Sequence, residues 1–297
     1  MSEAIKNRYE FIILFDVENG NPNGDPDSSN MPRVDPETNQ GIVTDVCLKK
    51  KIRRYVETVK EDVPGYAIYI RDDAPLNSKD NKAFEAIGVN PKDPKKAAKE
   101  DPDFEIKLRD FMCKNYFDIR TFGAVMTGFV SAKLNCGQVC GPVQLGFARS
   151  IDPIIQQDIT ITRTAQATEK DFSEKGSHTM GEKFIVPYAL YRAHGYISAN
   201  LARKTTGFSD EDLELLWNAI INMFEYDHSA ARGNMAVRKL IIFKHDSELG
   251  SAPAHKLFDL VTVKRADEEK PARSFNDYIV NIDESRLPEH ISVICKD

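Results

Sequence analysis

The sequence predicts an α+β sandwich of the ferredoxin-like type. Three observations predict it: a strand-like run at the start of the chain is followed by an amphipathic helix, two long extended segments flank a polar loop in the middle, and a capped helix precedes a late strand. The 297 residues are 41% hydrophobic and 29% charged, which is typical of a globular protein with a filled core. We expect a single domain over residues 1–297, with insertions.

The first predicted element is a buried strand over 9–17, a β-branched and aromatic run that reads YEFIILFDV. The loop that follows, 18–43, is rich in Gly, Asn, Pro and Asp. It is long for a compact domain, and such loops are usually functional or mobile. A helix begins after an N-cap at Thr44 or Asp45. Its expected apolar stripe is formed by Leu48, Ile52, Tyr55 and Val59.

The middle of the chain changes character several times. Pro64-Gly65 is expected to end the first helix, and 66–71 has the pattern of a second strand. Residues 72–105, rich in Lys, Asp and Pro, are predicted to be an inserted, partly helical and solvated segment. A helix over 104–116 follows. The next two segments, 118–128 and 139–153, are predicted as a strand end with a glycine turn and as a strand whose end carries Arg149.

The second half has clear signals. Residues 159–164 and 183–197 are predicted to be extended and to flank a polar loop over 165–182, which we expect to project from the body. Ser209 begins a helix with a capping box. A core strand over 236–244 follows, and the pattern is completed by the segments 253–263 and 277–282.

Charge and cysteine content narrow the class of protein. The net charge of −6 provides no global basic field, so a nucleic-acid site would have to be a local stripe. The five cysteines are an odd number, which favours reduced thiols over a disulfide framework, and Cys136 and Cys140 fall short of a zinc signature. The N-terminus lacks the apolar stretch of a signal peptide, and no run reaches transmembrane length. We therefore expect a cytoplasmic protein.

The stretch 16–54 is the strongest candidate for a binding site. A predicted strand ends in a Gly/Asn loop, and a helix with the basic run KKKIRR follows directly. Loop amides, Asn side chains and Lys/Arg charges can converge there on a phosphate backbone, with Lys49 and Arg53 one turn apart and Lys50 and Arg54 likewise. No nucleotide-binding loop signature occurs. The aromatic octapeptide with which RNA-binding sheets stack bases is also absent, so any RNA would be held by loops, the helix and the backbone.

Other candidate residues admit two interpretations. The acids Asp16, Glu18, Asp25 and Asp27 either hold Mg²⁺ for phosphodiester cleavage or cap and close turns. His178 and Met180 lie in the loop SHTMGEK. The methionine is either a packing residue or a wedge between bases.

Several motifs in order carry a family resemblance: DVENGNPNGDPD, MPRVDPETNQGIVTDVCLKKKIR, DIRTFGAVM, GPVQLGFARSID and HTMGEKFIVPYALYRAHGYI. Together they resemble the backbone subunit of the type I-C Cascade complex, a CRISPR-associated member of the RAMP superfamily. The resemblance implies a hand-like fold: an RRM-like palm, inserted finger segments (about 72–105 here) and a protruding β-hairpin thumb (about 163–183). The Lys-rich insert near Pro91 shows the least resemblance.

The resemblance also implies RNA-binding residues. The phosphate contacts fall on Lys49 and Arg53, supported by Asn21, Asn23, Arg33 and Lys50. Matching motifs place Arg120 and Gln144 against RNA, and the thumb contributes Arg163, Thr164, His178, Met180 and Lys183. Arg232 and the Lys-rich insert are further candidates for contact with target or displaced DNA.

The implied function is a non-enzymatic scaffold. Copies of the chain would form a helical filament along one CRISPR RNA (crRNA), whose bases remain free to pair with target DNA. The implied partners are crRNA, target DNA, further copies of the chain, a guide-processing or capping subunit and a large PAM-reading subunit, with no membrane, metal or cofactor. Two alternatives stay open: a metal-dependent RAMP-type RNA endonuclease using the Asp16–Asp27 acids, and a structural subunit that contacts only protein.

Overall fold

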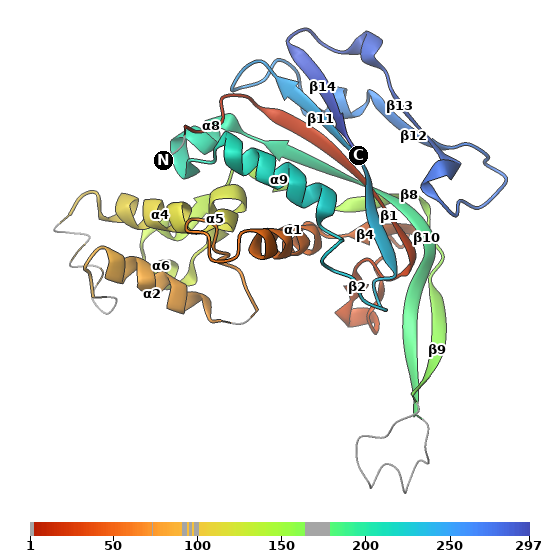
Figure 1. The fold of residues 1–297 in the computed structure, drawn as a ribbon, viewed down its shortest axis with the longest axis horizontal. Coiled ribbons are helices and arrows are strands. Elements are labelled where there is room, and N and C mark those ends of the chain that lie inside the picture. Colours follow the sequence, from red (N-terminus) through yellow and green to blue (C-terminus); the bar gives the residue numbers. More distant parts are fainter. Residues whose placement is uncertain (1–2, 73, 91–93, 95–96, 98–100, 164–178) are drawn as a thin grey trace, which may run out of the picture.

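A large antiparallel sheet organises the fold of this computed structural model, which describes residues 3–72, 74–90, 94, 97, 101–163 and 179–297 (Figure 1). The strands follow the order β14-β11-β1-β10-β8-β4, and β7 and β9 also pair with β10. Their bounds are β1 (Tyr9–Gly20), β4 (Gln40–Val43), β7 (Val143–Leu145), β8 (Ala148–Pro153), β9 (Gln157–Arg163), β10 (Thr179–Ile197), β11 (Asn234–His245) and β14 (Ile291–Lys296). The predicted first strand and late strand are thus confirmed as the neighbours β1 and β11.

The two faces of the sheet are covered by different elements. Side chains alternate along a strand, so Phe11, Ile13 and Phe15 of β1 join one core with residues of α1 (Asp45–Val59) and α9 (Asp210–Asn222). Ile12 and Leu14 join a second core on the opposite face, with α10 (Ala254–Phe258) and the hairpin of β12 (Val261–Arg265) and β13 (Tyr278–Ile282). Both faces are therefore occupied by protein.

A smaller unit with its own apolar cluster lies beside the sheet, at the left of Figure 1. Its buried residues run from Tyr69 to Val139 and include Phe84, Phe104 and Phe129. Its elements are α2 (Leu76–Ala86), α4 (Phe104–Asn115), α5 (Phe117–Phe122), α6 (Thr127–Ser131), β5 (Gly123–Val125) and β6 (Gln138–Cys140). Short elements elsewhere are β2 (Gly24–Asp25), β3 (Met31–Pro32) and α8 (Ala199–Leu201).

Two predicted strands are wrong. Residues 66–71 form no strand: Ala67 makes one isolated bridge to Tyr116, and the backbone N–H groups of Tyr69 and Ile70 donate to the carboxylate of Asp118. Residues 118–122 are helical, in α5, because Asp118 faces inward to accept those hydrogen bonds. A buried carboxylate decides the local structure of both segments, and neither segment's own pattern contains this information.

The predicted helix at the basic run is confirmed, and Leu48, Ile52 and Tyr55 of its predicted stripe pack on the core. Thr44 is the N-cap, and its Oγ1 accepts a hydrogen bond of 3.3 Å from the N–H of Cys47. The fully buried stripe is Leu48, Ile52 and Val56, whereas Val59 is 40% exposed and the helix ends there, before Pro64. The capping box of Ser209 is confirmed, with Asp212 as its partner.

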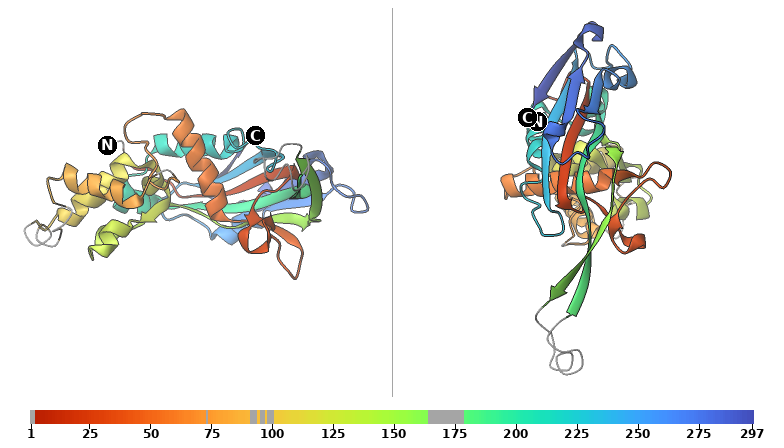
Figure 2. Two further views of the ribbon diagram at one scale, coloured as in Figure 1. Left: turned by 90° about the horizontal axis from the view of Figure 1, so that it is seen from below. Right: turned by 90° about the vertical axis from the view of Figure 1, so that its right-hand side faces the viewer.

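A two-stranded hairpin projects from the body (Figures 1 and 2). β9 and β10 pair from Arg163↔Thr179 to Gln157↔Ile185, which confirms the two predicted extended segments. Residues 179–182, predicted as loop, belong to β10, and 164–178 lie outside the described residues. The predicted strand over 139–153 is divided among the end of β6, β7 and β8. The strands β12 and β13 pair with each other in a separate two-stranded sheet. Among the helices that the structure describes, none is long and apolar enough to cross a membrane.

Candidate nucleic-acid interface

Helix α1 carries two rows of cations that differ sharply in exposure. The side chains of Lys50 and Arg54 are 62% and 53% exposed, whereas those of Lys49 and Arg53 are 14% and 10% exposed. The difference follows from the buried stripe of Leu48, Ile52 and Val56, which turns one basic row toward the smaller unit and leaves the other facing solvent.

The inner row is already paired. Lys49 Nζ lies 3.0 Å from the Asp45 carboxylate, and Arg53 Nε donates a 2.9 Å hydrogen bond to Asp118. Both cations also lie over the ring of Phe122, at 5.6 and 5.4 Å from its centroid. This geometry argues against Lys49 and Arg53 as the main phosphate ligands and gives them a role in attaching the smaller unit to α1.

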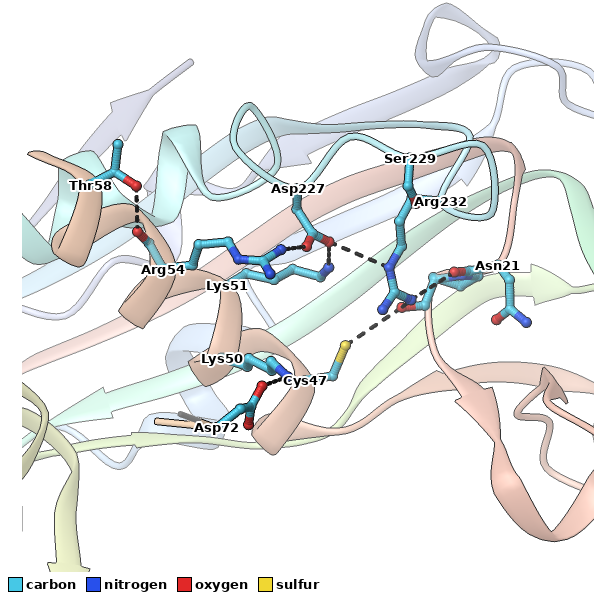
Figure 3. A network of polar contacts seen from close by, with 11 residues as sticks. Asn21, Cys47, Lys50, Lys51, Arg54, Thr58, Asp72, Asp227, Ser229 and Arg232 are labelled. Atoms are coloured by element: carbon cyan, nitrogen blue, oxygen red, sulfur yellow. Dashed lines mark hydrogen bonds and ion pairs between the residues drawn. The ribbon is translucent and has the colours of Figure 1, made fainter. Parts of the chain in front are cut away.

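The outer row belongs to a basic cluster, drawn in Figure 3. Lys50 Nζ is 2.7 Å from Asp72, and Arg54 Nη1 is 2.7 Å from Asp227. The carboxylate of Asp227 also contacts Lys51 Nζ, and Arg232 Nε lies 3.4 Å from it. We call the four cations Lys50, Lys51, Arg54 and Arg232 the α1 basic cluster; they outnumber the two carboxylates of Asp72 and Asp227 that pair with them, so the cluster is positively charged.

Arg232 joins the cluster to the loop after β1. Its Nη1 donates to the carbonyls of Asn21, at 3.1 Å, and Pro22, at 3.2 Å, while the N–H of Asn21 donates to Ala231 O at 2.8 Å. Gly20 is required at this crossing, because a Cβ there would lie 1.8 Å from the Arg232 carbonyl oxygen. Three segments distant in sequence therefore meet at one place: α1, the loop after β1 and the loop before β11.

Burial sets the electrostatics of the cluster. Lys51 is only 3% exposed, and desolvation lowers the pKa of its ammonium group although Asp227 opposes the shift. The Cys47 thiol, which donates to Pro22 O at 3.6 Å, has its pKa raised by burial. Asp227 thus supplies the carboxylate that compensates the buried charge of Lys51, while Arg54 and Arg232 are accessible to a ligand.

A groove of about 450 Å³ runs between α1 and residues 68–72. Its lining combines the cations Lys50, Arg53, Arg54 and Arg71 with exposed apolar side chains, since Val46 is 66% exposed and Ile70 45% exposed. Such a mixture suits a ligand that carries both phosphates and planar bases.

The other residues predicted in the first loop shape that loop. Asn21 Nδ2 donates to Asn30 O at 2.7 Å. Asn23 Oδ1 accepts from both the N–H and the Oγ1 of Thr44, each at 3.0 Å, and so supports the cap of α1. Arg33 lies 3.4 Å from Asp25. Asn23 thus attaches the loop to the start of α1, while Asn21 and Arg33 contact residues of the loop itself.

Arg120 and Gln144, predicted from family motifs, lie in different surroundings. Arg120 is 8% exposed: Nε and Nη2 donate to Asp212, and Nη1 donates to the carbonyl of Cys113 at 2.7 Å. This placement argues against the predicted RNA contact, because the guanidinium is engaged inside the protein. Gln144 is exposed, and its amide donates to Gly141 O at 3.1 Å.

On the projecting hairpin, Met180 is 83% exposed and pairs across the strands with Thr162, and Lys183 pairs with Ile159. Arg163 is the last residue of β9. Thr164 and His178 lie outside the described residues. The contacts predicted for this hairpin stay predictions.

The acidic residues do not assemble. Asp16 is 2% exposed and binds Arg238 Nε at 2.8 Å and the Tyr188 hydroxyl at 3.1 Å, and burial raises the pKa of its carboxyl. Asp25 caps a short helix, as turn chemistry predicts. Among the residues described, no group of three His, Cys, Asp or Glu side chains is placed to hold a metal ion. Nothing in this arrangement supports the nuclease alternative.

Lys51 and Asp227 were missed from sequence. Lys51 is three residues after Leu48 and one before Ile52, and both belong to the predicted stripe, so the sequence already contained the signal that places Lys51 beside the core. Asp227 gives no local signal, since it lies in a polar loop and meets α1 only through the fold.

The sequence of this chain is similar to CRISPR-associated proteins. A family model described as CRISPR-associated protein Cas7 matches residues 7–283. A protein of Haloferax volcanii, described as CRISPR-associated protein Cas7, is 25% identical over 296 residues, which cover 94% of this chain and 81% of that protein.

Solved structures show weaker likenesses. A chain of a CRISPR RNA-guided surveillance complex, pre-nicking, aligns with a TM-score of 0.49 at 13% identity over 80% of this chain and 78% of that one. A chain of the type III-B Cmr-beta complex bound to cognate target RNA aligns with a TM-score of 0.43 at 10% identity, over 80% and 61% of the two chains.

Proposed function

This chain belongs to the Cas7 family of CRISPR-associated proteins, and we propose that it is a crRNA-binding scaffold subunit of a type I-C surveillance complex. The family match spans 277 residues, from 7 to 283, and therefore includes the sheet, α1 and the projecting hairpin. The type I-C assignment rests on the order of the motifs in the sequence. The scaffold role rests on the geometry of the α1 basic cluster.

One observation carries the RNA-binding proposal. Lys50 and Arg54 are exposed one turn apart on α1, and Arg232 reaches the same place from a loop almost 180 residues later in the chain. Phosphate contacts of this kind position a nucleic acid without reading its sequence. A protein with an overall charge of −6 binds a polyanion only through such a local concentration of cations.

The covered faces of the sheet support binding at its margin. RNA-binding sheets of the RRM type stack bases on one open face. In this protein the face opposite to α1 and α9 is not open, because α10 and the β12–β13 hairpin pack on it, around Phe258 and Tyr278. In our proposal the sheet with α1 and α9 is an RRM-like palm, the unit of α2, α4 and α6 contains the finger insert, and the β9–β10 hairpin is the thumb.

The proposal extends to assembly. Several copies would follow one another along a single crRNA, each holding a stretch of backbone while the exposed bases pair with target DNA. The projecting hairpin supports this assembly. An isolated two-stranded hairpin is only marginally stable in water, and Ile159 and Ile161 are 40% and 39% exposed on it. In the proposed filament a neighbouring copy or the RNA would cover these side chains. The other partners would be a guide-processing or capping subunit and a large PAM-reading subunit.

The test is RNA binding by the purified protein as a function of salt. Lys50→Ala plus Arg54→Ala should weaken binding of guides of different sequence alike. The slope of log K against log salt should fall by roughly 1.4, since each phosphate contact on a single strand contributes about 0.7. Lys264→Ala plus Arg286→Ala removes the same charge from exposed positions outside the cluster and should leave the slope unchanged. Equal slopes in both pairs, or a wild-type protein that retains no guide RNA at low salt, would overturn the proposal.

A further inference from the structure

We infer that Asp227 is a positioning residue for the RNA backbone: a carboxylate inside the phosphate site that strengthens the binding of a polyanion. The inference rests on the proposed function and deepens it, because it names the group that arranges the binding cations. It also has an unusual consequence, since neutralising this acid would add positive charge to the site and yet weaken RNA binding.

Three cations converge on Asp227. Lys51, Arg54 and Arg232 all contact the one carboxylate of Asp227, which is 13% exposed (Figure 3). Without an anion between them, the three positive charges repel one another, and their long side chains move apart. With the carboxylate in place, the two arginines are held on either side of it (Figure 3).

The three cations differ in their exposure to solvent. Lys51 is buried at 3%, whereas Arg54 and Arg232 are 53% and 36% exposed. Asp227 therefore neutralises the cation that a ligand cannot reach and orients the two that it can reach. Each arginine has five N–H donors, and within the described residues Nη2 of both Arg54 and Arg232 has no protein partner. These donors are left for a phosphate.

Asp227 also attaches its own loop to the other segments of the site. Asp227 belongs to the loop 223–233 between α9 and β11, whose turns are closed by Asp227 N to Phe224 O, at 3.1 Å, and Arg232 N to Ser229 O, at 3.0 Å. Its ion pairs attach this loop to α1, and Arg232 attaches it to the carbonyls of Asn21 and Pro22. Removing the charge of Asp227 loosens the contact between all three segments that form the site.

The test compares two single neutralisations in the full-length protein. Asp227→Asn should weaken guide RNA binding at least tenfold. Asp72→Asn is the matched control: Asp72 pairs with Lys50 of the same cluster but is 85% exposed and contacts no second cation of the cluster, so its loss should leave binding equal or tighter. Asp227→Glu, which keeps the charge, should recover most of the lost affinity.

A further variant separates positioning from folding. Asp227→Asn leaves Lys51 as an unpaired buried charge, so Lys51→Met is combined with it to restore a stable fold. We expect this double variant to keep the wild-type melting temperature within a few degrees and still to bind RNA more weakly than Lys51→Met alone. The inference is overturned if Asp227→Asn binds RNA as tightly as Asp72→Asn, or if the double variant matches Lys51→Met. A failure of the proposed function looks different: wild-type protein would then bind no RNA at all.

Discussion

Arg120 binds Asp212 through two parallel hydrogen bonds, from Nε at 2.8 Å and from Nη2 at 2.7 Å. The pair is buried, and it joins α5 of the smaller unit to the first turn of α9 on the large sheet. Nη1 of the same guanidinium donates to Cys113 O and Gly65 O. Arg120 is thus a central connection between the two apolar cores rather than a surface ligand.

Replacing Arg120 should therefore affect folding. Arg120→Ala leaves the carboxylate of Asp212 buried without its counterion. Breaking such a buried pair typically lowers the free energy of unfolding by about 3–5 kcal/mol. We expect a loss of about that size in the free energy of unfolding, measured by denaturant titration. The matched change is Arg203→Ala, which removes an exposed arginine from its pair with Glu248 and should cost less than about 1 kcal/mol. Equal costs would contradict the structural role.

The elements that were predicted correctly carry their information locally. Thr44 and Ser209 are strong N-caps, and each is followed by a helical apolar stripe. The runs that became β1, β10 and β11 are β-branched and aromatic and fill a buried sheet. For such segments propensity, capping and burial agree, and the sequence pattern alone is sufficient.

The errors arise where a distant side chain decides. Asp118 accepts hydrogen bonds from Tyr69 and Ile70, almost 50 residues away, and this pairing replaces a sheet ladder. The site shows the same limit. The run KKKIRR predicts a basic helix, but which lysine faces solvent depends on a buried face that includes Val56 and leaves Val59 exposed. Asp227 and Arg232 reach the site only through the topology of β1 and β11.

The carboxylate of Asp118 gives a prediction for local dynamics. It is 1% exposed and accepts from Tyr69 N at 2.7 Å, from Ile70 N at 3.0 Å and from Arg53 Nε at 2.9 Å. In Asp118→Asn the charge is lost and one acceptor becomes a donor, so these bonds cannot all persist. Hydrogen exchange should show faster exchange of the Tyr69 and Ile70 amides, while amides in the middle of β1 change only with global stability. Unchanged protection at 69 and 70 would refute this account.

Asn23 tests whether the first loop binds RNA directly or through α1. Because its Oδ1 accepts both polar hydrogens of Thr44, Asn23→Ala should cost about 1 kcal/mol of unfolding free energy. The salt slope of RNA binding should stay the same, since no phosphate contact is lost. Asn281→Ala, at an exposed position on β13, is the control for stability. A smaller salt slope with unchanged stability would instead make Asn23 a direct RNA ligand.

The last prediction concerns pH and the environment of His194. Its Nε2 accepts a 2.9 Å hydrogen bond from Arg192 Nε, and its ring stacks on Phe258 at a centroid distance of 4.1 Å. Burial, and then the charge of Arg192, lower the pKa of His194 from 6.5 to about 4. In the unfolded chain the imidazole keeps its ordinary pKa, so between pH 6.5 and about 4 the unfolded state binds a proton that the folded state does not.

Protonation of the unfolded chain therefore destabilises the fold at low pH. Stability that is present above pH 6.5 is lost as the pH falls toward the folded-state pKa of about 4, and solvent screening of the partly exposed imidazole limits the loss at pH 5 to about 1 kcal/mol. Urea unfolding at pH 7 and pH 5 should show this loss in the wild type and a smaller loss in His194→Gln, which has no imidazole to protonate. His228→Gln, at an exposed histidine, should behave like the wild type. If His194→Gln keeps the full pH dependence, the imidazole is not the group whose protonation destabilises the fold.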